Sequence, residues 1–245
     1  MKQILIIARK ELQSFFDSLI AYVLLVAFLG FTGFFTWLLE SDIFLIKQAT
    51  LAAFFFYANW AFLIFIPAIT MKMLAEENKS GTIELLLTKP VTNWQILWGK
   101  FLACFALIVF ALLCTLPYYI TVANLVADGH KIDHGVIFCG YFALLLVSAA
   151  YISIGIFASS ITSNQIISFL IAIVIGIFFQ FIFSLVSAIF TGPVGDTLNY
   201  LGFMSHYDSI SRGVIDSRDL IYFGSIIFLG MILSELSLAK RTISE

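Results

Sequence analysis

The sequence predicts an all-α integral membrane protein with six transmembrane helices. The first observation is composition: of 245 residues, 61% are hydrophobic and only 11% are charged, and the mean hydropathy is +1.04. Soluble domains carry about 45–50% apolar and about 25% charged residues, so this chain has too little charge for a water-soluble surface. Membrane lipid is therefore expected to surround most of it. The net charge of −2 gives no attraction to nucleic acid, and no such partner is expected.

The second observation is a series of uncharged stretches long enough to cross a bilayer. A helix needs about 18 residues or more to cross roughly 30 Å of hydrocarbon. Backbone groups in lipid must hydrogen-bond within the protein, and these continuous apolar runs are too long for the alternating strands of a barrel. Helices are therefore predicted, and we expect the short last stretch to extend to Leu238. The stretches are residues 18–39, 49–71, 101–127, 135–160, 165–191 and 220–233.

The first stretch is predicted to be a retained helix and not a cleaved signal peptide. Its apolar core is longer than the usual ~7–15 residues, and no small-x-small cleavage site precedes Glu40. The sequence has no internal repeat and no low-complexity linker. Residues 1–245 are therefore expected to form a single domain.

The distribution of lysine and arginine predicts the orientation of the spans. The N-terminal segment, the loop after the second span and the C-terminal segment together carry nine of these residues, whereas the loops on the other side carry four. Positive residues near spans favour the cytoplasmic side. Both termini are therefore predicted to be cytoplasmic, as an even number of spans requires.

The segment 1–17, before the first span, is predicted to form a helix that lies in the membrane interface. Its apolar residues recur at helical spacing, while Lys10, Glu11 and Gln13 lie largely on another side. This pattern is typical of interfacial amphipathic helices. The alternative is a simple polar flank of the first span. The apolar residues are Leu5, Leu12, Phe15 and Phe16.

The segment 76–100 is predicted to be a cytoplasmic helix-turn-helix. Apolar residues after Gly81 (Ile83, Leu86 and Leu87) recur at helical spacing, and Pro90 ends that helix or bends the chain. Asn93 then caps a second short helix that carries Trp94 and Trp98. The alternative is a charged, solvated connector.

The sequence lacks the motifs of several enzyme classes. There is no HExxH, no GxSxG and no GxxxxGK, so neither a zinc protease nor a Walker-type ATPase is predicted. The three histidines fall in predicted outer loops, and the three cysteines lie in apolar stretches with no metal or redox spacing. We expect no cofactor, no metal and no catalytic residue in this chain.

A few residues inside the spans could serve a transported substrate. Asn59 and Gln180 could line a translocation path, although such polar residues more often hydrogen-bond a neighbouring helix. Pro67 and Pro117 are expected to kink their helices. Residues 178–190 could include a re-entrant segment. Small residues recur on the fourth span, and this pattern suits close helix packing either within one chain or between chains. They are Ala149, Ser153, Gly155 and Ser159.

The run from Ile66 to Ala103 resembles the signature of ABC-2 type permeases, and especially that of the gliding-motility-associated ABC permease subunit. In that family an acidic pair leads into G-T-x-E-x-L-L-x-x-P, and a Gly-Lys pair opens the third helix. The N-terminal RKEL and the run from Ser211 to Phe223 add to the resemblance. The matching residues are Glu76, Glu77, Gly81, Thr82, Glu84, Leu86, Leu87, Pro90, Gly99 and Lys100.

The resemblance implies a multi-pass protein of the bacterial inner membrane that pairs with a second copy or a similar permease. It also implies a cytoplasmic ABC ATPase subunit that hydrolyses ATP and docks on a coupling helix in the loop 76–100. This chain would then be a permease subunit and not itself an enzyme. The residues that would form the coupling site are Glu76, Glu77, Gly81, Thr82, Glu84, Leu87 and Pro90.

Three functions fit the six predicted spans and the family resemblance to different degrees. The first is a transport permease powered by a separate ATPase. The second is a membrane anchor or mechanical transmitter, for example in gliding motility or in cell-envelope machinery, which uses the same coupling but moves no substrate. The third is an integral-membrane enzyme or redox subunit, which the lack of paired histidines in the spans disfavours. No motif specifies a substrate.

Overall fold

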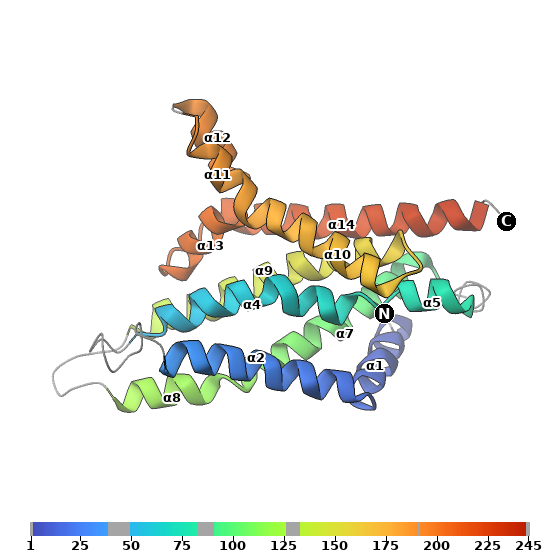
Figure 1. Ribbon diagram of the computed structural model, residues 1–245, viewed down its shortest axis with the longest axis horizontal. Helices are drawn as coiled ribbons and strands as arrows, with labels where there is room; N and C mark the ends of the chain where they lie inside the picture. The colour runs from blue at the N-terminus through green and yellow to red at the C-terminus, as the bar shows by residue number, and fades with distance from the viewer. Residues whose placement is uncertain (1, 39–49, 83–90, 126–132, 191, 244–245) are drawn as a thin grey trace.

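The computed structural model describes residues 2–38, 50–82, 91–125, 133–190 and 192–243, and the regular elements in these ranges are all helices (Figure 1). Six helical stretches are long and apolar enough to cross a membrane, which confirms the predicted number. The last begins before Leu220 and extends beyond Leu238. The six stretches are Leu19–Trp37, Ala52–Ser80, Asn93–Asn124, His134–Ser160, Gln165–Ser187 and Ser217–Lys240.

The helices run back and forth through the bundle, so the start of α1 and the end of α14 lie at the same end (Figure 1). The first half of the chain contains α1 (Lys2–Phe16), α2 (Leu19–Trp37), α4 (Ala52–Thr70), α5 (Ala75–Ser80), α7 (Asn93–Leu113) and α8 (Leu116–Asn124). The second half contains α9 (His134–Ser160), α10 (Gln165–Ile177), the π-helical turn η1 (Phe178–Ile182), α11 (Phe183–Ser187), α12 (Pro193–Tyr200), α13 (Phe203–Ser211) and α14 (Ser217–Ile243).

Side-chain caps begin several of the spans. The Ser18 hydroxyl accepts a hydrogen bond from a backbone N–H in the first turn of α2, and Asp133 and Asn164 do the same for α9 and α10. Such caps satisfy donors that the helix itself cannot satisfy. Kinks were predicted at Pro117 and Pro67. Near the first, the helix is interrupted, since α7 ends at Leu113 and α8 starts with Pro117 in its first turn. Helix α4 continues through Pro67.

Helix α9 lies at the centre of the bundle, where it packs against α4, α7, α10, α13 and α14. Its small residues permit this contact. A Cβ atom on Gly155 would lie 2.0 Å from the Thr70 hydroxyl oxygen of α4, and one on Gly230 of α14 would lie 2.8 Å from the Ser153 hydroxyl oxygen. The small residues of the fourth span therefore pack helices of the same chain together.

A helical hairpin projects from the bundle at the end opposite the start of α1 (Figure 1). The π-helical turn η1 continues α10 into α11, and α12 packs back against α11. Gly195 permits the close approach, since a Cβ atom there would lie 2.1 Å from the carbonyl oxygen of Phe190. The segment that the sequence suggested could be re-entrant thus forms the first half of a hairpin.

Candidate functional site

Helix α5 begins the predicted coupling segment, and the end of α9 holds it in place. The Ser159 hydroxyl accepts hydrogen bonds from the backbone N–H groups of Leu74 and Ala75, each at 2.9 Å, and donates to the carbonyl of Met71 at 3.1 Å. One buried hydroxyl therefore caps α5 from another helix. This contact joins residues that are about 85 positions apart.

A second contact joins α5 to the turn after α9. The Asn78 side-chain amide donates to the carbonyl of Thr162 at 3.1 Å and to that of Ser160 at 3.5 Å. Helix α5 ends at Gly81, whose φ of +69° is the left-handed conformation that favours glycine. A helix thus precedes Gly81, and the helical face that the sequence placed after it, at Ile83, Leu86 and Leu87, lies outside the described residues. Glu84, Leu87 and Pro90 lie outside the described residues.

The second half of the loop differs from the prediction in two respects, the residue that caps its helix and the length of that helix. Thr92 and not Asn93 caps the helix: the Thr92 hydroxyl accepts from the Gln95 N–H at 3.3 Å, and the Gln95 side chain accepts from the Thr92 N–H at 3.1 Å. This reciprocal capping box satisfies two free donors. The helix that starts there does not end as a short element, because no breaker follows, and it continues as α7 to Leu113.

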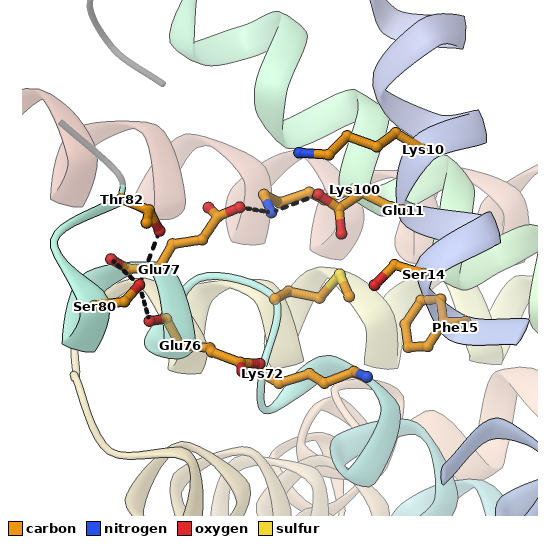
Figure 2. A pocket seen from close by; sticks show the side chains of 11 residues that line it. Lys10, Glu11, Ser14, Phe15, Lys72, Glu76, Glu77, Ser80, Thr82 and Lys100 are labelled. Carbon is orange, nitrogen blue, oxygen red and sulfur yellow. Dashed lines mark hydrogen bonds and ion pairs between the residues drawn. The ribbon is translucent and has the colours of Figure 1, made fainter. Parts of the chain in front are cut away.

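Lys100 on α7 is the centre of an ion-pair hub with one acidic residue on each of two other helices. Its ammonium group lies 2.7 Å from a carboxylate oxygen of Glu77 on α5 and 3.1 Å from one of Glu11 on α1. The lysine side chain is only 1% exposed. Figure 2 shows the three side chains converging from their helices. A buried charge is tolerated only when it is paired, so these two carboxylates fix Lys100 and are fixed by it.

The residue before this lysine explains how α1 comes so close. A Cβ atom on Gly99 would lie 2.6 Å from Cγ2 of Ile7 and 3.3 Å from the carbonyl oxygen of Ile4. Glycine therefore allows α1 to cross α7, and the adjacent Lys100 then bonds to α1 through Glu11. In the Gly-Lys pair of the sequence motif, Gly99 thus permits the close packing of α1, and Lys100 forms the ion pairs.

The N-terminal segment is helical as predicted, and α1 packs against both α7 and α2. Of its predicted apolar face, Phe15 is buried and Leu12 and Phe16 pack against the core, whereas Leu5 is exposed. The interior face of α1 is thus the one that carries Glu11 and Phe15. The segment is more than a polar flank, because it takes part in the hub.

A polar cleft of about 310 Å³ opens between α1, α5 and the start of α7. Figure 2 shows Glu76 and Glu77 on one side and Lys10 and Ser14 on the other. The Lys72 ammonium lies 4.9 Å from the centre of the Phe15 ring, a cation–π distance. The lining residues are Lys10, Glu11, Ser14, Phe15, Lys72, Met73, Glu76, Glu77, Ser80, Thr82 and Lys100.

The predicted coupling residues thus have different environments. Glu76 and Thr82 are exposed, and the Thr82 hydroxyl lies 2.8 Å from that of Ser80. Glu77 is partly buried and bonds to Lys100. One of its carboxylate oxygens is buried without a partner in the described part of the chain. Glu76 is therefore accessible to another protein, whereas Glu77 belongs to the internal hub.

Sequence reasoning did not assign four residues to this site, although three of them were noted for other reasons: Lys100 in the Gly-Lys pair, Glu11 in the N-terminal segment and Ser159 among the small residues of the fourth span. Their partners lie far along the chain, so the sequence did not show that they meet. The Gly-Lys pair and the acidic residue of the amphipathic segment were the only signals in the sequence for the hub itself. The four residues are Glu11, Asn78, Lys100 and Ser159.

Asn59 and Gln180, the two candidates for a translocation path, meet inside the chain. Asn59 is 1% exposed and Gln180 is 3% exposed. Their amides point to the sulfur of Met204, at 3.9 Å and 3.8 Å, and Tyr151 donates to the Gln180 side-chain oxygen at 3.1 Å. These contacts bridge α4, α9, η1 and α13. Both residues therefore hydrogen-bond neighbouring helices of the same chain.

The comparison with known protein families supports the resemblance seen in the sequence. The profile of the ABC-2 family transporter protein matches residues 5–238, which is nearly the whole chain. A comparison with curated protein sequences finds no significant match. The profile match concerns the family as a whole and gives no support to a closer relation with the gliding-motility-associated subunit. The six apolar helices and this match together show that the chain is a multi-pass membrane protein of the ABC-2 transporter family.

Proposed function

We propose that this chain is the permease subunit of an ABC transporter and that a separate, cytoplasmic ATPase subunit drives it. The family match and the six spans support this proposal. The observation that carries it is the ion-pair hub, in which buried Lys100 joins α1, α5 and α7 at one end of the bundle. The sequence has no GxxxxGK motif, so a partner must hydrolyse the ATP.

The contacts of α5 give it the properties of a coupling helix. It follows α4 directly, is capped by Ser159 of α9, and is bonded to α7 and, through Lys100, to α1. A displacement of α5 would therefore be passed to several spans. An ATPase can drive such a displacement only if its contacts with α5 differ between nucleotide states, because a ligand shifts an equilibrium by its differential affinity.

The docking surface consists of the exposed side of α5 and the residues after it. Glu76, Lys79 and Thr82 are exposed there. Glu84, Leu87 and Pro90, which complete the family motif, are proposed to contribute to ATPase coupling as well. This surface must face the cytoplasm, where a soluble ATPase is found. Both chain ends are then cytoplasmic as well, in agreement with the lysine and arginine distribution.

The complete transporter contains a second permease, either another copy of this chain or a similar protein, in the bacterial inner membrane. Exposed apolar side chains on α2 and α10 face lipid or this second permease. The side chains of Asn59 and Gln180 meet at Met204 inside the chain. The proposed substrate path runs next to this polar contact.

One observation favours the alternative of a mechanical transmitter. The hairpin of α11 and α12 projects from the bundle (Figure 1) and exposes Leu185, Ile189 and Val194. Such a projection could hold a partner at the membrane surface, as a cell-envelope or gliding machine would require. The same ATPase coupling would then move a partner instead of a substrate.

Site-specific photocrosslinking tests the ATPase docking surface. A photoreactive amino acid replaces the exposed Lys79 of α5, and in a matched control it replaces the exposed Asp196 of α12, at the other end of the bundle (Figure 1). In cells, we expect the label at position 79 to capture a protein with a Walker A motif, identified by mass spectrometry, and the label at 196 not to capture it. Equal capture at both positions, or none at 79, would contradict the proposal.

A further inference from the structure

A second cavity lies at the opposite end of the bundle from the hub. Its volume is about 520 Å³, within the range of small-molecule sites. The starts of α4 and α9 form its apolar walls, and α13 closes it with polar and charged residues. The lining residues are Thr50, Leu51, Ala52, Phe55, Phe56, Val136, Ile137, Tyr207, Asp208, Ser211 and Arg212.

The wall formed by α13 is held rigidly from both sides. The Tyr207 hydroxyl, on a side chain only 2% exposed, donates to the carbonyl of Phe55 at 2.7 Å. The neighbouring His206 bonds to the Asp219 carboxylate at 2.6 Å and to the Tyr200 carbonyl at 2.7 Å. A carbonyl can only accept, so His206 Nε2 carries a proton. Helix α13, which carries the charged residues of the cavity, is therefore anchored to α4, α12 and α14.

Asp208 and Arg212 carry opposite charges in the lining of this cavity, and their side chains form no ion pair with each other. The Asp208 carboxylate is half-buried, and it makes neither a hydrogen bond nor an ion pair in the described ranges. Burial raises the pKa of Asp208, whereas the charge of Arg212 lowers it. Arg212 is exposed and donates through Nε to the backbone carbonyl of Asp208 at 3.1 Å. Its terminal N–H groups make no hydrogen bond within the described residues.

We propose that this cavity binds a phospholipid with a zwitterionic, amine-containing headgroup. The ammonium group pairs with Asp208, the phosphate pairs with Arg212, and acyl chain carbons pack on Phe55, Phe56 and Ile137. A ligand with one sign of charge would satisfy one of the two residues and be repelled by the other. A small polar molecule would leave the apolar walls without contacts.

The position of the cavity fits this occupant. It lies at the starts of two spans, where headgroups meet hydrocarbon, and Phe56 at its edge is 43% exposed. Charge-assisted bonds from ammonium and guanidinium groups are among the stronger hydrogen bonds in proteins. The site is independent of the ATPase-coupling role and would be present in the isolated chain.

Lipid binding to the purified full chain tests the proposal. Native mass spectrometry in detergent compares added phosphatidylethanolamine with phosphatidylglycerol of the same acyl chains. We expect wild type to bind the ethanolamine lipid more tightly. Asp208→Asn should lower its affinity by about tenfold, the effect of losing one charge-assisted bond. The matched control Asp196→Asn changes an exposed carboxylate on α12 and should have no effect. Excess soluble phosphoethanolamine, which is the headgroup alone, should compete only weakly.

A second variant tests the cavity without changing its charges. Ala52→Phe adds a ring to the lining and should exclude the acyl chain, so ethanolamine-lipid affinity should again fall about tenfold while phosphatidylglycerol affinity is unchanged. Retained helical circular dichroism shows that each variant folds. The proposal is overturned if both lipids bind wild type equally, if Asp208→Asn and Ala52→Phe both leave the affinity unchanged, or if phosphoethanolamine competes as well as the lipid.

Discussion

The Lys100 ammonium lies 2.7 Å from a carboxylate oxygen of Glu77 although the two residues stand on different helices. The same ammonium reaches Glu11 on a third helix at 3.1 Å. This buried lysine therefore connects the amphipathic helix α1, the short helix α5 and the span α7. Because each acid depends on the lysine for its counter-charge, the three helices are expected to move and to unfold as one unit.

Lys100→Met should destabilise the protein strongly. The substitution keeps most of the side-chain volume but leaves two carboxylates facing each other, and removal of one partner from a buried pair typically costs about 3–5 kcal/mol. Thermal unfolding in detergent, followed by the fluorescence of nearby Trp94 and Trp98, measures the loss. The variant that also carries Glu11→Gln and Glu77→Gln should recover much of the stability. An unchanged midpoint for Lys100→Met alone would show that the hub contributes nothing.

Gly99→Ala should separate α1 from α7. The added methyl group would lie 2.6 Å from Ile7 Cγ2 and 2.7 Å from Ile7 Cβ, so the helices must shift. Overpacking of this kind costs roughly 1–3 kcal/mol. Gly224→Ala on α14 is the matched control, since a Cβ atom there meets nothing within 4 Å, and alanine favours a helix over glycine. Thermal midpoints should thus fall for the first variant only; a fall of the same size in both would refute the close crossing.

Ser159→Ala should loosen α5 without unfolding the bundle. It removes the acceptor of the Leu74 and Ala75 N–H groups, and loss of such a cap costs about 1 kcal/mol. Hydrogen exchange should therefore become several-fold faster at residues 74–80. The control is Ser148→Ala on the same helix, because within the described ranges the Ser148 hydroxyl donates to a carbonyl of its own helix and to no other helix. If both variants exchange alike, Ser159 does not hold α5.

Gln180→Leu should cost stability through its partner Tyr151. The tyrosine hydroxyl would lose its acceptor at 3.1 Å and remain buried, at a cost of about 1–3 kcal/mol. Tyr151→Phe removes the stranded hydroxyl, so the double variant should be more stable than the sum of the two single changes predicts. Unfolding midpoints of the four proteins give the coupling. Strict additivity would mean that the two side chains do not interact.

Hydropathy alone predicted the six spans because it is a local property: each span needs a long uncharged run, and the sequence provides six. The span boundaries predicted from hydropathy were less accurate where charged and apolar residues mix. Helix α7 starts at Asn93, where Thr92 caps it, and not at Phe101, where the uncharged run begins; it includes Lys100 because two acids pair with this lysine. A rule that stops a span at a charge cannot anticipate such a pair.

The sequence predicted a coupling segment but none of the tertiary contacts that the structure shows in it. The acidic pair and the Gly-Lys pair mark the segments that contain Glu77 and Lys100, yet the division between exposed Glu76 and internal Glu77 depends on Lys100 of α7, 23 residues later in the sequence. The role of Ser159 depends equally on the packing of α9 beside α5. Tertiary contacts of this kind leave no local pattern, so the sequence named the loop and the structure was needed to identify the hub.

ATP turnover of the purified complex tests the central claim most directly. The ATPase subunit is measured alone, with the wild-type chain in lipid, and with Glu76→Lys, which reverses an exposed charge on α5 and spares the hub. Asp196→Lys, the same change on exposed α12, is the control. We expect wild type and Asp196→Lys to alter turnover equally, and Glu76→Lys to return it to the value of the ATPase alone. If Glu76→Lys behaves like wild type, or if the wild-type chain leaves turnover unchanged, α5 does not couple this chain to an ATPase.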